Sequence, residues 1–399
     1  MRLGLVGVGY FPFLIAGEKN FYFRLVPELR PKLDDLVVIS VNDAAERISH
    51  QDTPAGEVPI YNFVRPIDGR RDNRHFGTTN GVRHYHHRHN AMREIGEKSA
   101  TLLLGTRRIR QIVKDHSLDW LYFLDNFGPG MAYARRAFGT SVGFAAANYQ
   151  PRGARYDALQ QRFVQPLDLV VTYSKAYRDI LRTMLPAERI EVIHWGVDPE
   201  GFTPRSQADR DAARAELGIS PGATLVVWSG FLQQIQAEDF RRTVAIAREV
   251  RSARRDIEFL FCFKPETYRA DFSVESADGV QVLCGVPRFV DLLAAADVFL
   301  SPVGNVRSTV SPPLTWIEAM SMGTPVLSTR VGGAAEVIDD GVSGYLVDGY
   351  AQLADALRRM GSPTESMRAA ARRTVIDRYQ IATAAARHID AFQKRGRRD

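Results

Sequence analysis

Cysteine and long hydrophobic runs are scarce in this 399-residue chain, and each scarcity excludes a class of protein. Only Cys262 and Cys284 are present, which excludes a disulfide scaffold and a four-cysteine zinc site and favours a reducing, cytoplasmic setting. No apolar run reaches the ~18–20 residues that a membrane-spanning helix needs. The nearest approach, residues 3–17, is interrupted by Pro12 and several glycines, so we expect a buried strand and a glycine loop there rather than a signal peptide.

The charge balance is mildly basic and favours no single partner. Lysine and arginine number 52 against 46 aspartates and glutamates, a formal net charge of +6. This permits anionic ligands such as nucleotides, sugar phosphates or an acidic membrane surface, and we expect no nucleic-acid partner. Hydrophobic residues make up 45% of the chain, which is enough for a sizeable core, and at ~100–200 residues per domain the length predicts two domains.

Short apolar runs and helical patterns alternate twice along the chain, as in parallel sheets with helices on both faces. Residues 196–222, rich in proline, glycine and charge, are interpreted as the linker between the halves. The predicted fold class is α/β with two doubly wound domains, whose ligands lie beyond the carboxyl ends of the strands. The expected strands are 36–41, 120–124, 141–146 and 168–174 in the first half, and 224–229, 257–263, 280–283, 297–302 and 325–329 in the second.

The most informative stretch is 285–348, where an expected strand is followed by a polar loop of small residues and then by a helix. The exposed N–H groups at the start of such a helix suit an anion. A carboxylate, Glu318, lies about one turn inside this helix, and a second strand with a double-glycine turn follows. The residues that make up the pattern are Glu318-Ala319-Met320, Gly323, Pro325-Val326, Gly332-Gly333, Glu336, Gly341 and Gly344.

This pattern resembles that of the glycosyltransferases of family 4, which have the GT-B fold. Two earlier segments, 167–181 and 194–202 (HWGVDPEGF), are similar to the same family. The resemblance implies two Rossmann-like domains that face each other across a cleft, with an acceptor-binding domain over 1–196 and a donor-binding domain over 197–379. It also implies that a final helix, at about 380–399, packs back on the first domain.

The resemblance further implies transfer of a sugar, with retention, from a nucleotide-sugar donor to a small-molecule or glycan acceptor. No metal and no cofactor besides the nucleotide-sugar co-substrate are expected. Glu318 corresponds to the carboxylate that binds the donor's ribose, and the alternative is a helix-start carboxylate that interacts with the helix dipole. The other donor-binding residues expected are Gly17, Gly230, Ser308, Thr309, Ser311, Pro313, Leu314 and Glu336.

The sequence departs from the family pattern at three positions that normally contact the donor. Val310 stands where the family has a first glutamate, and Phe231 and Gln236 stand where it has the arginine and lysine that bind the diphosphate. Lys264 and Arg307 are candidate replacements, with solvated surface residues as the alternative. Two further alternatives stay open: a non-standard donor such as a phosphoribosyl diphosphate, or a catalytically inactive binding protein.

Asp125 and Asn126 follow the expected strand 120–124 and are candidate catalytic residues. Either could position an acceptor hydroxyl, and Asp125 could act as a base. The glycine loop near the N-terminus is similar to a dinucleotide-binding fingerprint, but Pro12 replaces its third glycine, which argues against an oxidoreductase.

Residues 62–93 are basic and rich in histidine, with seven arginines against two aspartates, a net charge of +5. This region predicts an anionic acceptor or peripheral contact with anionic lipid, with a solvated loop as the alternative. The run HYHHRH at 84–89 has no accompanying carboxylate or cysteine, so no metal site is predicted.

Overall fold

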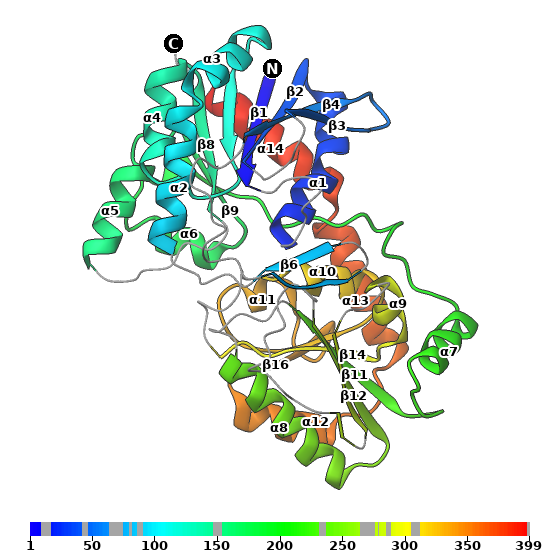
Figure 1. Ribbon diagram of the computed structural model, residues 1–399. Helices are drawn as coiled ribbons and strands as arrows, with labels where there is room; N and C mark the ends of the chain where they lie inside the picture. The colour runs from blue at the N-terminus through cyan, green and yellow to red at the C-terminus, as the bar shows by residue number, and fades with distance from the viewer. Residues whose placement is uncertain are drawn as a thin grey trace. The chain divides into compact units, whose positions relative to one another are not determined.

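The chain forms two compact units, which are described here one at a time (Figure 1). Unit 1 comprises Met1–Asn73, His87–Gly196 and Ile381–Asp399, and unit 2 comprises Arg74–His86 and Val197–Gln380. The computed structural model describes residues 1–8, 17–41, 47–63, 75–79, 82–85, 91–146, 154–230, 237–263, 276–277, 279–284, 289–304 and 312–396.

Unit 1 is built on an eight-stranded sheet of order β10-β9-β8-β7-β1-β2-β4-β3. The strand pairings of this sheet are parallel except that of β3 with β4. The strand order reverses at β1, which lies between β7 and β2, so the carboxyl ends of β1 and β7 form a topological switch point. The strands are β1 (Arg2–Val8), β2 (Asp35–Val41), β3 (Ile48–Gln51), β4 (Val58–Phe63), β7 (Trp120–Phe123), β8 (Ser141–Ala145), β9 (Leu169–Thr172) and β10 (Ile190–Val192).

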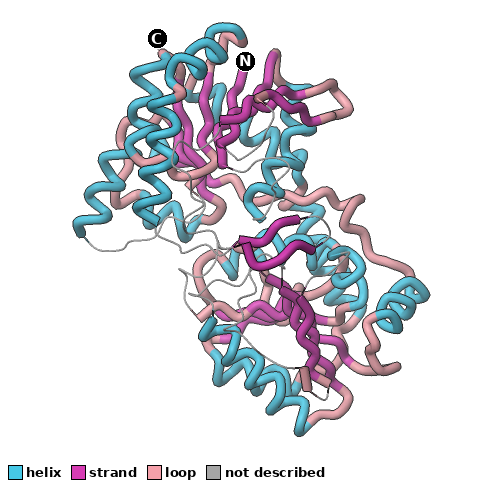
Figure 2. The backbone as a smooth tube through the Cα atoms, viewed as in Figure 1, coloured by secondary structure: helices cyan, strands magenta, loops and turns pink. Residues whose placement is uncertain are grey.

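Helices cover both faces of this sheet, as Figure 2 shows, and alternate residues of β7 explain why. Leu121 and Phe123 lie in a core cluster with side chains of α3 and α4, whereas Trp120 and Tyr122 point to the other face, each 5.2 Å from the ring of Phe392 in α14. Successive side chains of a strand point to opposite faces of the sheet, so apolar side chains on both faces must be covered by helices. The helices are α1 (Gly17–Leu29), α2 (Ala91–Leu104), α3 (Thr106–Asp115), α4 (Pro129–Phe138), α5 (Ala154–Val164), α6 (Lys175–Leu181) and α14 (Ile381–Arg395).

The last helix, α14, packs within unit 1 although it follows unit 2 in the sequence. Its Arg395 guanidinium donates to the carboxylate of Glu191 in β10 at 2.9 Å. Its His388 is wholly buried among aromatic rings, 6.3 Å from Tyr22 and 5.8 Å from Tyr122, and Nδ1 lies 2.8 Å from the carbonyl of Ala384.

Burial lowers the pKa of His388 to about 4, which predicts acid-sensitive stability. The unfolded chain binds a proton below about pH 6.5 while the folded chain stays neutral down to about pH 4, so the free energy of unfolding falls as the pH falls through this window. The loss reaches about 3 kcal/mol at pH 4. Urea denaturation at several pH values should show this slope in the native chain and a shallower one in His388→Leu; equal slopes would contradict the assignment.

Unit 2 is built on a six-stranded parallel sheet of order β13-β12-β11-β14-β15-β16, and its order reverses at β11. The predicted α/β class with two parallel sheets is confirmed. A hairpin of β5 (His75–Thr79) and β6 (Val82–Tyr85) also groups with unit 2, although the sequence places these residues in the first domain. The strands of the sheet are β11 (Thr224–Gly230), β12 (Ile257–Phe263), β13 (Val280–Cys284), β14 (Val298–Ser301), β15 (Val326–Thr329) and β16 (Gly344–Val347).

Side-chain caps start several of the helices. The hydroxyls of Ser174, Ser206 and Thr364 each accept the N–H three residues further on, at 3.1–3.2 Å, and so begin α6, α7 and α13. The helices of unit 2 are α7 (Gln207–Glu216), α8 (Ala237–Ala253), α9 (Phe289–Ala295), α10 (Leu314–Ser321), α11 (Ala334–Val337), α12 (Tyr350–Arg359) and α13 (Glu365–Arg378).

A buried carboxylate at the start of β14, Asp297, joins α7 and α13 to the sheet. Its oxygens accept from Arg210 at 3.1 Å and Arg214 at 2.9 Å, both of α7, from Arg368 of α13 at 2.6 Å, and from the N–H of Leu225 at 2.8 Å. Burial, and secondarily the neighbouring Arg368, lowers the pKa of Arg210. Helix α7 has no buried residue, and Arg210 and Arg214 also donate to the carbonyls of Ala294 at 2.6 Å and Ala295 at 3.1 Å, so these two arginines contribute much of its attachment.

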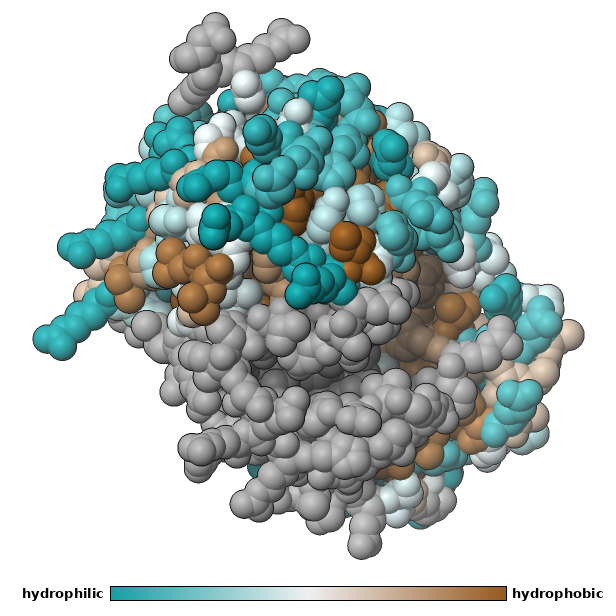
Figure 3. Space-filling view, turned by 45° about the horizontal axis from the view of Figure 1, so that its top comes forward, coloured by the Kyte–Doolittle hydropathy of each residue, from teal (hydrophilic) through white to brown (hydrophobic). Residues whose placement is uncertain are grey.

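Hydrophilic side chains predominate on the face in Figure 3, with small groups of exposed hydrophobic ones between them. Within the part of the chain that the structure describes, no helix is both long and apolar enough to cross a membrane.

Candidate functional site

Helix α10 carries the carboxylate that the sequence singles out. Pro313 precedes the helix in an extended conformation (ψ 142°), its carbonyl accepts the N–H of Trp316 at 3.1 Å, and Gly323 ends the segment with φ at 73°. Glu318 is only 5% exposed, as deeply buried as the apolar residues beside it. A carboxylate is seldom buried without hydrogen-bond or ionic partners, and Glu318 has a polar interaction within the chain.

Hydrogen bonds hold residues 301–304, at the end of β14, in place. Thr329 Oγ1, at the end of β15, accepts the N–H of Val303 at 2.9 Å and donates to its carbonyl at 2.7 Å. Ser328 Oγ donates to the carbonyl of Ser301 at 2.7 Å, and Gly304 N–H donates to Asp239 of α8 at 3.2 Å. These hydroxyls were not predicted, although two hydroxyl residues at a strand end were a readable signal.

The double-glycine turn leads into α11, where Glu336 is half-buried. Gly332 has φ at 50°, in the left-handed region that favours glycine. The carbonyl of Glu336 accepts the hydroxyl of Tyr379 at 2.6 Å, and burial raises the pKa of Tyr379 to about 12. Because a four-residue helix is weak on its own, this bond from a buried, neutral tyrosine helps to fix the turn.

At two of the predicted glycine positions, a neighbouring atom leaves little room for a Cβ. A Cβ on Gly344 would lie 2.5 Å from the carbonyl oxygen of Val326 in the neighbouring strand, so β15 and β16 pair only with glycine there. A Cβ on Gly230 would lie 3.1 Å from the indole of Trp228, whose ring packs against Phe240 at 5.2 Å. Donor contact by Gly230 stays a prediction.

Asp125 joins the two strands at the switch point of unit 1. Its Oδ2 accepts the N–H of Val8 at 2.8 Å, which ties the end of β7 to the end of β1. Its Oδ1 lies 3.5 Å from the ammonium of Lys98 in α2, and both side chains are largely buried. Lys98 was not predicted, because nothing in its local sequence distinguishes it from a surface lysine. A catalytic role for Asp125 stays a prediction.

The neighbouring Asn126 shapes the turn before α4. Its Oδ1 accepts the N–H of Gly128 at 2.8 Å, and its Nδ2 donates to Gln160 at 2.9 Å. Gly128 has φ at 53°, so the turn depends on both residues. These contacts give Asn126 a structural function beside the predicted one.

The structure leaves several predicted residues untested. Gly17 is the first residue of α1, and Leu314 is the first residue of α10. Lys264, Arg307, Ser308, Thr309 and Ser311 lie outside the described residues, as do Phe231, Gln236, Val310 and most of 62–93. Among the described residues, no three histidine, cysteine, aspartate or glutamate side chains gather as metal ligands would.

Two family models match the chain, and each covers most of one predicted domain. The model described as glycosyltransferase family 4 matches residues 63–200, and that described as glycosyl transferases group 1 matches residues 223–362. The two halves of the chain are thus similar to glycosyltransferases, the first to those of family 4 and the second to those of group 1. The pattern at 285–348 lies wholly within the second match.

Named relatives match the chain over part of their length. D-inositol 3-phosphate glycosyltransferase of Nocardia farcinica is 35% identical over 183 residues, which are 43% of this chain and 39% of that protein. The enzyme of the same name from Saccharomonospora viridis is 35% identical over 208 residues, 48% of this chain and 44% of that one. The chain thus matches less than half the length of these curated relatives.

Solved structures confirm the GT-B fold of this chain. Anabaena HepE in complex with UDP superposes with a TM-score of 0.68 at 14% identity, covering 99% of this chain and 100% of that one. Sucrose-phosphate synthase of Thermosynechococcus elongatus gives 0.72 at 15% identity, covering 99% and 98%. At such low identity the likeness establishes the fold and nothing finer.

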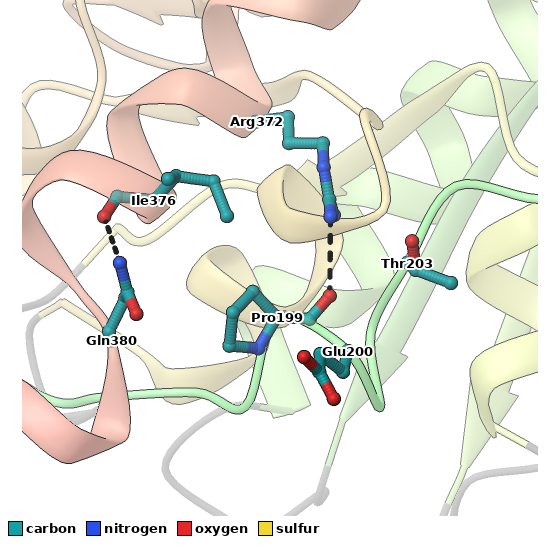
Figure 4. A pocket seen from close by; sticks show the side chains of 6 residues that line it. All are labelled: Pro199, Glu200, Thr203, Arg372, Ile376 and Gln380. Atoms are coloured by element: carbon teal, nitrogen blue, oxygen red, sulfur yellow. Dashed lines mark hydrogen bonds between the residues drawn. The ribbon is translucent and has the colours of Figure 1, made fainter.

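One shallow surface pocket lies in unit 2 (Figure 4). It is lined by Pro199, Glu200, Thr203, Arg372, Ile376 and Gln380. Arg372 points across it and donates to the carbonyls of Pro199 at 3.3 Å and Ser321 at 2.6 Å. Ser321 ends α10, about 12 Å along the helix from its start. The pocket is therefore at the opposite end of α10 from the predicted donor contacts.

Proposed function

We infer that the protein is a glycosyltransferase that moves a sugar, with retention, from a nucleotide-sugar donor to a hydroxyl of a small-molecule or glycan acceptor. The observation that carries this proposal is the buried carboxylate of Glu318 on α10, within the part of the chain that the group 1 model matches. A carboxylate there suits the two hydroxyls of a ribose, which a bare phosphate lacks.

The proposed donor site has its polar groups at the carboxyl edge of the unit 2 sheet. The first N–H groups of α10, after Pro313, point toward the end where a diphosphate would bind. Glu318, about one turn further in, would accept the ribose hydroxyls. HepE has been crystallised with UDP and with UDP-glucose, and starch synthase IV of Arabidopsis thaliana with ADP.

The proposed chemistry needs positioning and charge stabilisation rather than a covalent enzyme intermediate. The leaving phosphate would take the acceptor's proton on the face of the sugar that it leaves, and the protein would orient both partners. Each hydrogen-bond donor positioned at a developing charge lowers the activation barrier by ~2.7–4 kcal/mol. We propose Lys264 and Arg307 for this function, because Phe231 and Gln236 carry no charge.

The proposed acceptor is anionic. The support is the net charge of +5 over 62–93 and the inositol 3-phosphate in the names of the relatives. Lys98 adds a cation beside Asp125 at the carboxyl edge of the unit 1 sheet. An acceptor phosphate would be bound by such cations while its hydroxyl meets the donor.

A nucleotide panel tests the proposed function. Thermal unfolding is recorded with UDP, GDP, ADP, phosphoribosyl diphosphate or no ligand. We expect one nucleoside diphosphate to stabilise the fold by about 2.7 kcal/mol at 100 times its Kd, a shift of several degrees in Tm. Stabilisation by phosphoribosyl diphosphate alone would favour the non-standard donor, and no stabilisation by any ligand would favour an inactive binding protein.

A further inference from the structure

The last turn of α2 exposes two consecutive leucines. Leu103 is 52% exposed and Leu104 is 74% exposed, whereas Leu102 is buried, with Cδ1 2.8 Å from where a Cβ on Gly130 would lie. Among the described residues the other exposed large hydrophobic side chains are Ile48 and Val342, which lie apart in the sequence. Single exposed hydrophobic residues are ordinary, but an adjacent pair at a helix end marks a contact surface.

Helix α3, which follows after one residue, divides into an apolar face and a cationic face. Ile109, Ile112 and Val113 are buried in the core of unit 1. Arg107, Arg110 and Lys114 are exposed, and their spacing of three and four residues places them on one stripe. The remaining cation, Arg108, turns inward: it donates to the carbonyls of Asn62 at 2.8 Å and Arg47 at 2.9 Å. The helix has one acidic residue, Asp115, which accepts from Gln111 at 2.6 Å.

Helix α4 extends this cationic stripe. Arg110 donates to the carbonyl of Ala137 at 3.4 Å, and the hydroxyls of Thr106 and Tyr133 are 3.3 Å apart, so α3 and α4 lie side by side. Arg136 of α4 is exposed, and α4 has no acidic residue. The surface formed by Leu103, Leu104, Arg107, Arg110, Lys114 and Arg136 is called the leucine–arginine face below.

We propose that the leucine–arginine face docks unit 1 on an anionic lipid bilayer. The two leucines would enter the boundary between headgroups and acyl chains, while the cations would contact lipid phosphates. A nucleic acid would use the cations but would leave the leucines in water. With no described helix able to span a bilayer, this contact is peripheral. It requires no sugar transfer, so it stands independently of the proposed function.

Vesicle co-sedimentation of the whole chain tests the proposal. The vesicles are phosphatidylcholine alone, or phosphatidylcholine with one third phosphatidylglycerol. We expect binding to the anionic vesicles only, weakened by salt. The double variant Leu103→Ser, Leu104→Ser should bind at least tenfold less. Arg107→Gln and Arg110→Gln should each weaken binding about fivefold, because a cation near the surface contributes about 1 kcal/mol.

A matched double variant, Ile48→Ser with Val342→Ser, removes two side chains of comparable exposure, 46% and 55%, and should bind like the native chain. Equal binding by both double variants would overturn the proposal, as would no binding of the native chain to anionic vesicles. Binding that depends on the cations alone, and that heparin or RNA displaces equally in both double variants, would overturn it in favour of a polyanion partner. Circular dichroism and Tm identify any variant that has not folded.

Discussion

Glu318→Ala is expected to lose measurable nucleotide binding while the chain still folds. The carboxylate would accept two ribose hydroxyls, and each hydrogen bond to a charged group contributes about 1.5–3 kcal/mol, so the loss in affinity should be about a hundredfold or more. Isothermal titration with the nucleoside diphosphate that stabilises the native chain measures this directly. Glu318→Gln, which keeps one acceptor oxygen, should fall between the two.

Glu258 offers a matched control. It is also 5% exposed and also lies in unit 2, but on β12, where its carboxylate accepts the N–H of Ser220 at 3.4 Å. Glu258→Ala removes a buried carboxylate of the same size and should leave nucleotide affinity unchanged. Equal affinity of Glu318→Ala and the native chain would refute the ribose assignment, and parallel losses in both variants would point to general damage to unit 2.

Asp297→Ala should cost about 3–5 kcal/mol in the free energy of unfolding. Removal of this carboxylate leaves Arg210, Arg214 and Arg368 partly buried without their shared counter-charge, and breaking such a pair strands the remaining charge. The variant should also loosen α7, which has no buried residue to retain it. Urea denaturation gives the change, and limited proteolysis near α7 gives its location.

The comparison for this prediction is Asp168→Ala in unit 1. Asp168 is bonded by one arginine, Arg135, at 2.8 Å and by the N–H of Val142 at 3.0 Å, and its side chain is 19% exposed. Because one exposed arginine is released rather than three partly buried ones, the loss should be close to 1 kcal/mol. Similar losses at both positions would show that the arginine network of unit 2 adds nothing beyond a single ion pair.

Most of the strands that the sequence predicted are buried on both faces, although the edge strand β13 is only partly buried. Residues 120–124 are a continuous apolar run and residues 257–263 are apolar except for Glu258, which is close to the pattern that a central parallel strand requires. Strand β4, which includes Pro59 and Asn62, and the four-residue β16 were missed because their composition is mixed or their length short. Their assignment depends on pairing with strands distant in the sequence.

The interpretation of 196–222 as a linker was incomplete, because α7 lies within it. Its contacts are arginine side chains on Asp297, and no hydrophobic periodicity reveals them. The residues of the candidate site likewise fall into those that the local sequence reveals and those that it does not. Glu318 and its glycines follow from local spacing, whereas the contacts of Lys98 and Tyr379 are made with residues far along the chain.

The position of α14 has a consequence for how a nascent chain matures. The ribosome completes residues 1–196 about 10–40 s before it reaches α14, at roughly 5–20 residues per second. Until then, Trp120 and Tyr122 lack the helix that covers them in the finished molecule. The first unit to be synthesised is therefore the last to close, and its exposed aromatic surface during translation is where a chaperone would bind.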